Sequence, residues 1–454
     1  MLFTSSVFWI FFVIVVFLLE TNYRFIGSLR NQNLILLIAS YIFYGYWDWY
    51  FLGLIFFVSL QTYISAKFIH QFRSLKNIAL TLSILINLGV LFYFKYANFF
   101  FYELTSAFGI ENSFTLENII LPVGISFYIF QSFTYVFDVY SEKILPEKDP
   151  IKYFTFVAFF PQLVAGPIER ASALLPQFNQ LKTITLENLY LGCKIIIIGL
   201  FLKSFIADSI APLTDEIFAN YKEFNGGTLL LGAIGFTIQI YGDFAGYSFI
   251  AIGVAMIINF NLMSNFNTPY FSTSIQDFWR RWHISLSTFF RDYVYIPLGG
   301  SRLSEKITNR NLLITFSVSG LWHGANWTFI IWGICHGLLL MLQRIFSASV
   351  NKFIGWLLTM SLVLILWIMF RSESIGDFIS YIQIIISEPG IPEGKSILIF
   401  VMYYFLLDLI LLFYSERGTV WFGNIILETF TLALMLIVVV GIIGQSQNFI
   451  YFQF

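Results

Sequence analysis

The histidines of this chain are few and unevenly placed. Of four, three fall within 54 residues: His283, His323 and His336. An imidazole with its ordinary pKa of about 6.5 can take up and return a proton near neutral pH. Acyl transfer from a thioester to a hydroxyl needs such a group to remove the hydroxyl proton, and histidine performs this task most often. A lone buried histidine is more often a satisfied core residue, but the clustering favours a catalytic site.

The spacing of His323 and His336 limits how they could cooperate. They are 13 residues apart, which on one straight helix would separate them by about 20 Å. The intervening Gly324, Ala325 and Asn326 could turn the chain. Two antiparallel segments would then bring the imidazoles closer, with Asn326 beside them in a cavity.

Other motifs give little support to competing chemistry. The histidines lack metal-ligand spacing and the HExxH pattern is absent, so we expect no metal site. GxSxG, Walker A and GxGxxG motifs are also absent. Cys193 and Cys335 lie in apolar runs and are expected to be buried thiols, although Cys335 beside His336 leaves a nucleophile possible.

Three further segments concentrate polar residues. Gln131, within Leu121–Tyr140, either lines a substrate cavity or packs between helices. The prolines of Phe159–Arg170 predict a break in the helix there. Asp243, between Gly242 and Gly246, either pairs with the basic region 261–310 or lies in the substrate cavity and orients a catalytic group. A charged residue in a membrane span needs such an explanation because its burial in lipid is costly.

The elements that must position these residues are transmembrane helices. The 454 residues are 58% hydrophobic and 11% charged, with a mean hydropathy of +0.78, whereas soluble domains carry roughly 25% charged residues. The net charge of −1 provides no basic field for nucleic acid. We predict an all-α multi-pass protein with about 11–13 transmembrane or re-entrant helices. The apolar segments are 3–20, 33–47, 50–66, 78–98, 118–139, 189–210, 228–258, 311–325, 327–344, 353–370, 396–415 and 428–447.

Loop charges predict an orientation, because cytoplasmic loops are enriched in Lys and Arg. Loops 21–32 and 67–77 are basic, as is the long stretch 261–310, and we place all three in the cytoplasm. The acidic loops 99–117 and 371–395 would then lie outside. We expect the first apolar segment to be a retained transmembrane span rather than a cleaved signal peptide. We expect a single domain over residues 1–454, with a motif core at about 120–340 and further spans over 345–454.

Two long motifs carry a family resemblance. DFWRRWHISLSTFFRDYVYIPLGG, Asp277–Gly300, closely resembles the hallmark of the membrane-bound O-acyltransferase family, and LWHGANWTFIIWGICHG, Leu321–Gly337, resembles its catalytic-histidine region. The segments around Gln131, Pro161 and Asp243 are also similar to the bacterial branch that includes alginate O-acetylases and teichoic-acid D-alanyl transferases. The resemblance covers about residues 1–370.

The resemblance implies a ring of helices around a funnel, with His323 near its narrow point as the catalytic base. His336 and His283 would support it. The donor would be a cytoplasmic acyl thioester, coenzyme A or a carrier protein, with no bound cofactor. Arg280, Arg281 and Arg291 are candidate donor contacts, although a purely topogenic role is equally open.

The function expected from the resemblance is O-acetylation of an exported polysaccharide such as alginate. A separate extracytoplasmic acetyltransferase would be the partner, and the inner membrane the location. D-alanyl transfer to teichoic acid and peptidoglycan O-acetylation are the enzyme alternatives. A transporter is the alternative of another class, but the inverted repeats typical of transporters are not found in the sequence.

Overall fold

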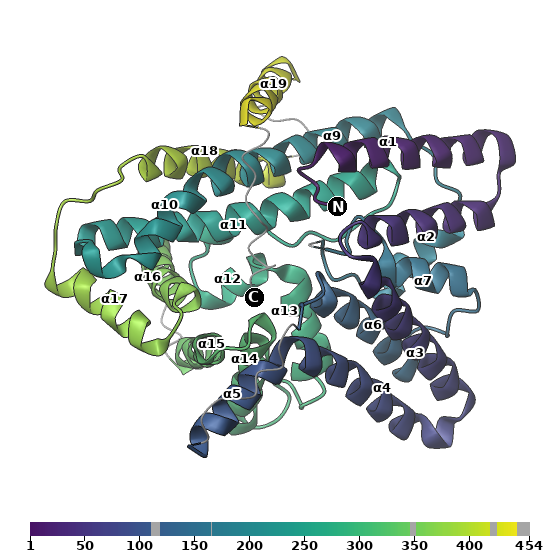
Figure 1. Cartoon of the computed structure of the whole chain (residues 1–454), viewed down its shortest axis with the longest axis horizontal. Helices are drawn as coiled ribbons and strands as arrows, with labels where there is room; N and C mark the ends of the chain where they lie inside the picture. The colour runs from purple at the N-terminus through teal and green to yellow at the C-terminus, as the bar shows by residue number, and fades with distance from the viewer. Residues whose placement is uncertain (110–118, 165, 346–350, 418–424, 443–454) are drawn as a thin grey trace. The chain divides into compact units, whose positions relative to one another are not determined.

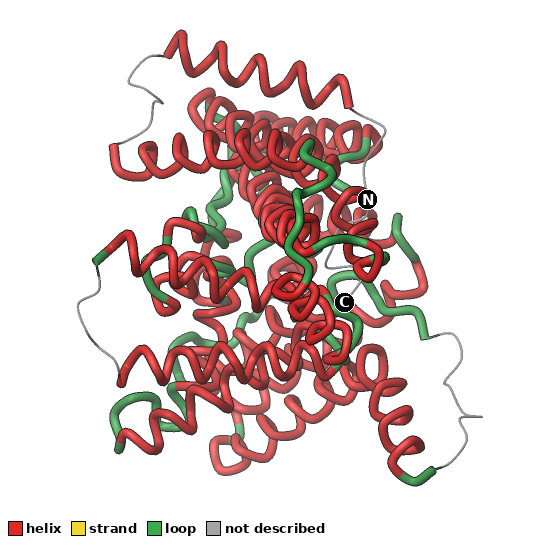
Figure 2. The backbone as a smooth tube through the Cα atoms, turned by 90° about the vertical axis from the view of Figure 1, so that its left-hand side faces the viewer, coloured by secondary structure: helices red, strands yellow, loops and turns green. Residues whose placement is uncertain are grey.

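The computed structural model describes residues 1–109, 119–164, 166–345, 351–417 and 425–442. Across these residues all regular structure is helical, and they contain no strand (Figure 2). The all-α prediction is therefore confirmed. Lipid offers the backbone no hydrogen-bond partners, and a helix satisfies its N–H and C=O groups within one segment.

Each of the predicted apolar segments overlaps a helix. Within the described ranges, seven helical stretches are long and apolar enough to cross a membrane by length and composition: Ser6–Ile26, Trp49–Gln71, Arg73–Ala107, Leu186–Ala219, Gly226–Ile257, Trp327–Ile345 and Lys352–Arg371. The short segment 33–47 corresponds to α2 (Leu29–Gly45), which is not among them. The chain is a multi-pass membrane protein.

The chain divides into two compact units. The first comprises Met1–Ile196 and Ala251–Met263, and the second comprises the rest of the chain. The prediction of one domain ringed around a funnel stays a prediction.

The first unit is built from short and long helices that pack through buried polar contacts. Its helices are α1 (Ser6–Thr21), α2 (Leu29–Gly45), α3 (Leu52–Gln71), α4 (Lys76–Leu91), α5 (Ala97–Ala107), α6 (Ile125–Tyr140), α7 (Pro150–Ala158), α8 (Ala171–Leu174) and most of α9 (Leu186–Leu200). The hydroxyls of Thr62 on α3 and Tyr153 on α7 lie 2.7 Å apart. Helix α7 ends at Ala158 and the next helix begins at Ala171, so the break predicted from Pro161 and Pro167 is confirmed.

The second unit contains the histidine-rich region. Its helices are α10 (Asp208–Ala219), most of α11 (Gly226–Ile257), α12 (Ile275–Arg281), α13 (Ile284–Phe290), α14 (Glu305–His323), α15 (Trp327–Ile345), α16 (Lys352–Arg371), α17 (Ile375–Ser387), α18 (Ile397–Arg417) and α19 (Ile425–Ile442). Helices α14 and α15 lie side by side (Figure 1). A Cβ atom on Gly320 would clash with the Phe329 carbonyl, and one on Gly333 with the Phe316 carbonyl. Glycine at these positions therefore permits the close approach of the two helices.

The expected burial of the two cysteines is wrong, because neither side chain is fully buried. Cys193 is exposed on α9, and Cys335 is partly exposed. An apolar run in a membrane helix also supplies the surface that faces lipid, so hydrophobicity of the neighbours does not predict burial of a given side chain.

Candidate functional site

The turn between α14 and α15 brings the two histidines of the second motif to one aromatic side chain. His323 is the last residue of α14, and His336 lies on α15. The ring centroid of Trp332 is 5.1 Å from that of His323 and 4.6 Å from that of His336. The turn predicted at Gly324–Asn326 is thus present, and one indole contacts both imidazoles.

Further aromatic rings surround both histidines. His323 lies 5.0 Å from Trp322 and 5.4 Å from Phe370 between ring centroids, and it is only 3% exposed. His336 is 1% exposed and packs against Trp279, with ring centroids 4.9 Å apart. Such burial excludes water and lowers the local dielectric, which strengthens electrostatic interactions with reacting groups.

His336 also has a polar partner that the sequence did not indicate. The indole Nε1 of Trp279, on α12, donates a hydrogen bond of 3.2 Å to Nδ1 of His336. The two residues are 57 positions apart in the chain. Trp279 lies between Phe278 and Arg280 in the basic stretch 261–310, and nothing in that local sequence distinguishes its indole as such a donor.

His283 is buried at the start of α13. Its backbone has φ +41°, in the left-handed region that non-glycine residues rarely adopt. Its ring packs edge-to-face on Phe244, with centroids 4.6 Å apart, and lies 6.0 Å from that of Trp322. Burial lowers the pKa of His283 to about 3, because desolvation disfavours the charged imidazolium. His283 is therefore neutral at physiological pH.

Asn265 holds the backbone beside His283, a role that no pattern in the sequence indicates. Its carbonyl accepts the N–H of Ile284 at 2.9 Å, and its Oδ1 accepts the Ser285 hydroxyl at 2.6 Å. Its Nδ2 donates to the Ser248 hydroxyl of α11 at 3.0 Å. These bonds offset the strain at His283 and fix α13 against α11.

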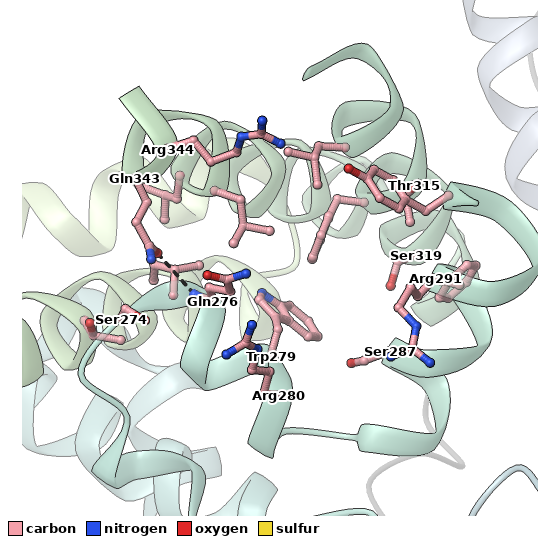
Figure 3. Close-up of a pocket in the computed structure, with 18 of the residues that line it drawn as sticks. Ser274, Gln276, Trp279, Arg280, Ser287, Arg291, Thr315, Ser319, Gln343 and Arg344 are labelled. Atoms are coloured by element: carbon pink, nitrogen blue, oxygen red, sulfur yellow. Dashed lines mark hydrogen bonds between the residues drawn. The ribbon is translucent and has the colours of Figure 1, made fainter. Parts of the chain in front are cut away.

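A large cavity opens beside Trp279 (Figure 3). Its volume is about 1560 Å³, and three arginines from different elements line it: Arg280 of α12, Arg291 after α13 and Arg344 of α15. The cavity wall includes Trp279, the hydrogen-bond donor to His336. It also includes Ser319, which lies four residues before His323 on α14 and hence on the same helix face.

The structure distinguishes among the arginines predicted to bind the donor. Arg280 and Arg291 line the cavity, whereas Arg281 is not among its lining residues. Instead, Arg281 Nε lies 3.0 Å from Asp277 Oδ1 in an ion pair within α12. Arg344 was not predicted, because a single basic residue in the last turn of a helix ordinarily has only a dipole-compensating role.

Asp243 forms a buried ion pair. Its Oδ1 lies 2.5 Å from Lys203 Nζ, which also lies 2.6 Å from Asp208 Oδ1. The cation thus comes from the π-helical segment Phe201–Ala207, outside the basic region 261–310. π-helical turns are frequent at functional sites. The two ion pairs explain how a charged side chain is tolerated in this helix, and the role of Asp243 in a substrate cavity stays a prediction.

The other two predicted cavity residues have structural hydrogen bonds. Asn326 accepts the N–H of Thr328 at 3.0 Å, which caps α15, and donates to the carbonyl of Glu373 at 2.8 Å. Gln131 belongs to the first unit, where its Nε2 donates to the Phe156 carbonyl at 3.5 Å. Their roles in a substrate cavity stay predictions.

Metal binding has no geometric support in the part of the chain that is described. No group of three or more His, Cys, Asp or Glu residues in those ranges is arranged to hold a metal ion. The expectation of a metal-free reaction stays a prediction.

Comparison with known proteins identifies the family. Residues 41–372 match the model of the MBOAT, membrane-bound O-acyltransferase family. The chain is 43% identical over 387 residues to a probable alginate O-acetylase AlgI of Azotobacter vinelandii, covering 83% of this chain and 76% of that protein. A peptidoglycan O-acetyltransferase of Helicobacter pylori is 35% identical over 391 residues, 78% of this chain and 74% of that protein.

A more distant relative shows the breadth of the family. The teichoic acid D-alanyltransferase of Bacillus subtilis is 31% identical over 255 residues, which cover 53% of this chain and 63% of that protein. The family match decides against the transporter alternative. This chain belongs to the membrane-bound O-acyltransferase family and is a multi-pass membrane O-acyltransferase.

Proposed function

We propose that this enzyme transfers an acetyl group from a cytoplasmic thioester towards an exported polysaccharide such as alginate. Relatives named probable alginate O-acetylase match 83% of the chain at 39–43% identity. The enzyme passes the acetyl group to a hydroxyl acceptor on the way to the polysaccharide, and the donor is acetyl-coenzyme A or an acetylated carrier protein.

The observation that carries this proposal is the cavity that joins three arginines to the histidine region. Arg280, Arg291 and Arg344 line it together with Trp279 and Ser319. Guanidinium groups bind phosphate through paired N–H donors, and both donors carry a phosphorylated pantetheine arm. The arginines therefore suit the phosphates, while Trp279 and Ser319 lie where the thioester would approach His336 and His323.

His323 is proposed as the general base. It takes the proton from the attacking hydroxyl while the hydroxyl oxygen bonds to the thioester carbonyl carbon. The tetrahedral intermediate then collapses, the carbon–sulfur bond breaks, and the proton passes to the departing thiolate. His336 and the neutral His283 support this step as polar groups in the dry aromatic surroundings.

The cellular setting follows from the same proposal. The charge of the basic stretch 261–310 supports a cytoplasmic orientation, towards the compartment where the anionic donor is made, and we propose the inner membrane as the location. A separate extracytoplasmic acetyltransferase completes the transfer of the acetyl group to the polysaccharide. Family membership supports the membrane setting, and the orientation rests on the loop charges.

Peptidoglycan O-acetylation is the second candidate function. The Helicobacter pylori relative with this name covers a similar share of the chain at 35% identity. D-alanyl transfer to teichoic acid has weaker support, because that relative matches only 53% of the chain.

The test replaces His323 with Ala or Gln in the native cell. Ester-linked acetate on exported polysaccharide and on peptidoglycan is measured by chemical release, with the membrane level of each variant determined by immunoblot. His70→Ala is the matched control, because His70 is exposed at the end of α3. We expect at least a 100-fold loss of polysaccharide acetate in the His323 variants and no loss in the control.

Other outcomes separate the candidates. Loss of acetate from peptidoglycan alone would support the second function. Unchanged esters on both polymers in a strain lacking the whole gene would refute both.

A further inference from the structure

The hydrogen bond between Trp279 and His336 fixes the protonation of one imidazole. An indole N–H can only donate a hydrogen bond. Since Trp279 Nε1 lies 3.2 Å from His336 Nδ1, that nitrogen must present its lone pair. In a neutral imidazole the proton then resides on Nε2, and in an imidazolium both nitrogens would be donors.

The surroundings of His336 reinforce this assignment. The imidazole is 1% exposed, and aromatic rings lie on several sides: Trp332 at 4.6 Å, Trp279 at 4.9 Å and Phe278 at 6.3 Å between centroids. Protonation at Nδ1 would place an N–H group against the indole N–H in apolar surroundings. The hydrogen bond therefore opposes the charged form and the other tautomer.

Trp279 also connects this imidazole to the substrate cavity. The residue lies on α12 next to Arg280, and both residues line the cavity (Figure 3). Beyond His336, the indole of Trp332 contacts both His336 and His323. An acyl donor bound in the cavity would thus contact Trp279, the residue that orients His336.

We propose that Trp279 is a positioning residue that holds His336 as the neutral Nε2–H tautomer. In this form His336 is a hydrogen-bond donor in acyl transfer rather than a second base, and His323 alone accepts the proton of the acceptor. The catalytic part of this inference rests on the proposed function. The tautomer itself does not, because it is a property of the protein without substrate.

The first test reads the tautomer directly. The full-length protein is labelled with ¹⁵N-histidine, placed in phosphatidylglycerol and phosphatidylethanolamine bilayers, and studied by solid-state NMR at pH 7. With four histidines in the chain, the His336 signals are assigned by their loss in His336→Asn. We expect an unprotonated Nδ1 and a protonated Nε2. A protonated Nδ1 would overturn the proposal.

Trp279→Phe then removes the indole N–H while it keeps an aromatic ring. We expect its His336 signals to shift to a mixture of the two neutral tautomers. Trp356→Phe is the matched control, because the Trp356 indole donates a bond of 2.8 Å to the Tyr270 carbonyl rather than to a histidine. Unchanged His336 signals in Trp279→Phe would contradict the proposal.

The second test measures coupling in the cell through ester-linked acetate per enzyme molecule. We expect Trp279→Phe to lower acetylation about tenfold in the wild-type background and to have little effect in a His336→Leu background, since effects through one contact are not additive. His336→Asn, whose amide oxygen can accept the indole N–H, should retain more activity than His336→Leu. An equal loss of acetylation in both backgrounds would mean that Trp279 only lines the cavity and does not act through His336. If neither Trp279→Phe nor His336→Leu alters acetylation while His323→Ala abolishes it, the catalytic role of His336 is refuted. If His323→Ala also leaves acetylation unchanged, the proposed function fails, and the NMR result alone then decides the tautomer assignment.

Discussion

Lys203 Nζ lies 2.5 Å from Oδ1 of Asp243, and both side chains are almost fully buried. Asp208 lies 2.6 Å from the same ammonium group. One cation thus serves two carboxylates within the helices of the second unit. Removal of the Lys203 ammonium group would take away the cation that both buried carboxylates contact.

We predict that Lys203→Met destabilises the protein strongly. Removal of one partner from a buried ion pair costs about 3–5 kcal/mol, because the remaining charge keeps its desolvation penalty. Thermal unfolding in detergent micelles, followed by circular dichroism, measures the effect. Arg73→Met is the control, since Arg73 and Glu142 form an exposed pair whose loss is expected to cost at most about 1 kcal/mol. Equal melting temperatures for the two variants would contradict the structural role.

The close packing of α14 on α15 leads to a prediction about two glycines. We expect Gly320→Ala and Gly333→Ala to separate the helices and lower both stability and activity, because each added methyl group would meet a carbonyl oxygen of the neighbouring helix. Overpacking of this kind costs about 1–3 kcal/mol. Gly89→Ala on α4 provides the control. A Cβ there meets nothing within 4 Å, so the variant should be as stable as the parent or more so. Unfolding temperature and ester acetate are measured for all three variants, and a harmless Gly320→Ala would argue against the tight contact.

Glu169 predicts a pH dependence of stability. Burial raises the pKa of this carboxyl group to about 7, against a smaller opposing effect of the Met263 N–H and of Arg170. The folded protein then binds a proton more tightly than the unfolded chain, whose glutamate has its ordinary pKa of 4.5. The stability contributed by this group is fully present below pH 4.5 and is lost as the pH rises through about 7.

Glu169→Gln tests this sign. The amide cannot ionise, so we expect the variant to lose this decline in stability between pH 5 and pH 8 and to be more stable than the parent by about 1–3 kcal/mol at pH 8. Melting curves across that range measure the difference. The Met263 N–H still has an acceptor, because the amide oxygen can replace the carboxylate oxygen at 2.5 Å. A variant whose pH profile matches that of the parent would show that Glu169 ionises normally.

Because three arginines line the cavity, we predict that the affinity for the proposed thioester donor depends on the salt concentration. On the proposed function, we expect Arg280→Ala, Arg291→Ala and Arg344→Ala each to raise the KM for acetyl-coenzyme A about 5- to 50-fold, because each would remove charge-assisted hydrogen bonds worth roughly 1–3 kcal/mol to phosphate. The kcat should change less. Arg302→Ala is the control, since Arg302 is exposed in the same basic stretch but does not line the cavity. The assay measures free thiol released by purified enzyme at two ionic strengths.

The outcome distinguishes binding from topology. If Arg302→Ala impaired the enzyme as much as the cavity variants, the arginines would act through overall basic charge. Loss of membrane insertion in all four variants, seen as a lower membrane level, would support the topogenic role instead.

The sequence by itself determined the helical membrane character, the family and the histidines of interest. Apolar runs long enough to cross lipid specify helices through local composition, and Asp277–Gly300 and Leu321–Gly337 carry a specific motif. The turn after His323 could also be predicted, because Gly324 and Asn326 favour the end of one helix and the start of another.

Only the tertiary structure decided which partners these residues have. Lys203 lies in an apolar helix, and its sequence neighbours do not indicate that it pairs with Asp243. Trp279 donates a hydrogen bond to His336, a residue 57 positions away in the chain. Arg344 lines the cavity, whereas Arg281 forms an ion pair with Asp277. Such choices depend on contacts between segments far apart in sequence. Local composition and spacing set which elements form, but they do not specify which side chains meet when those elements pack.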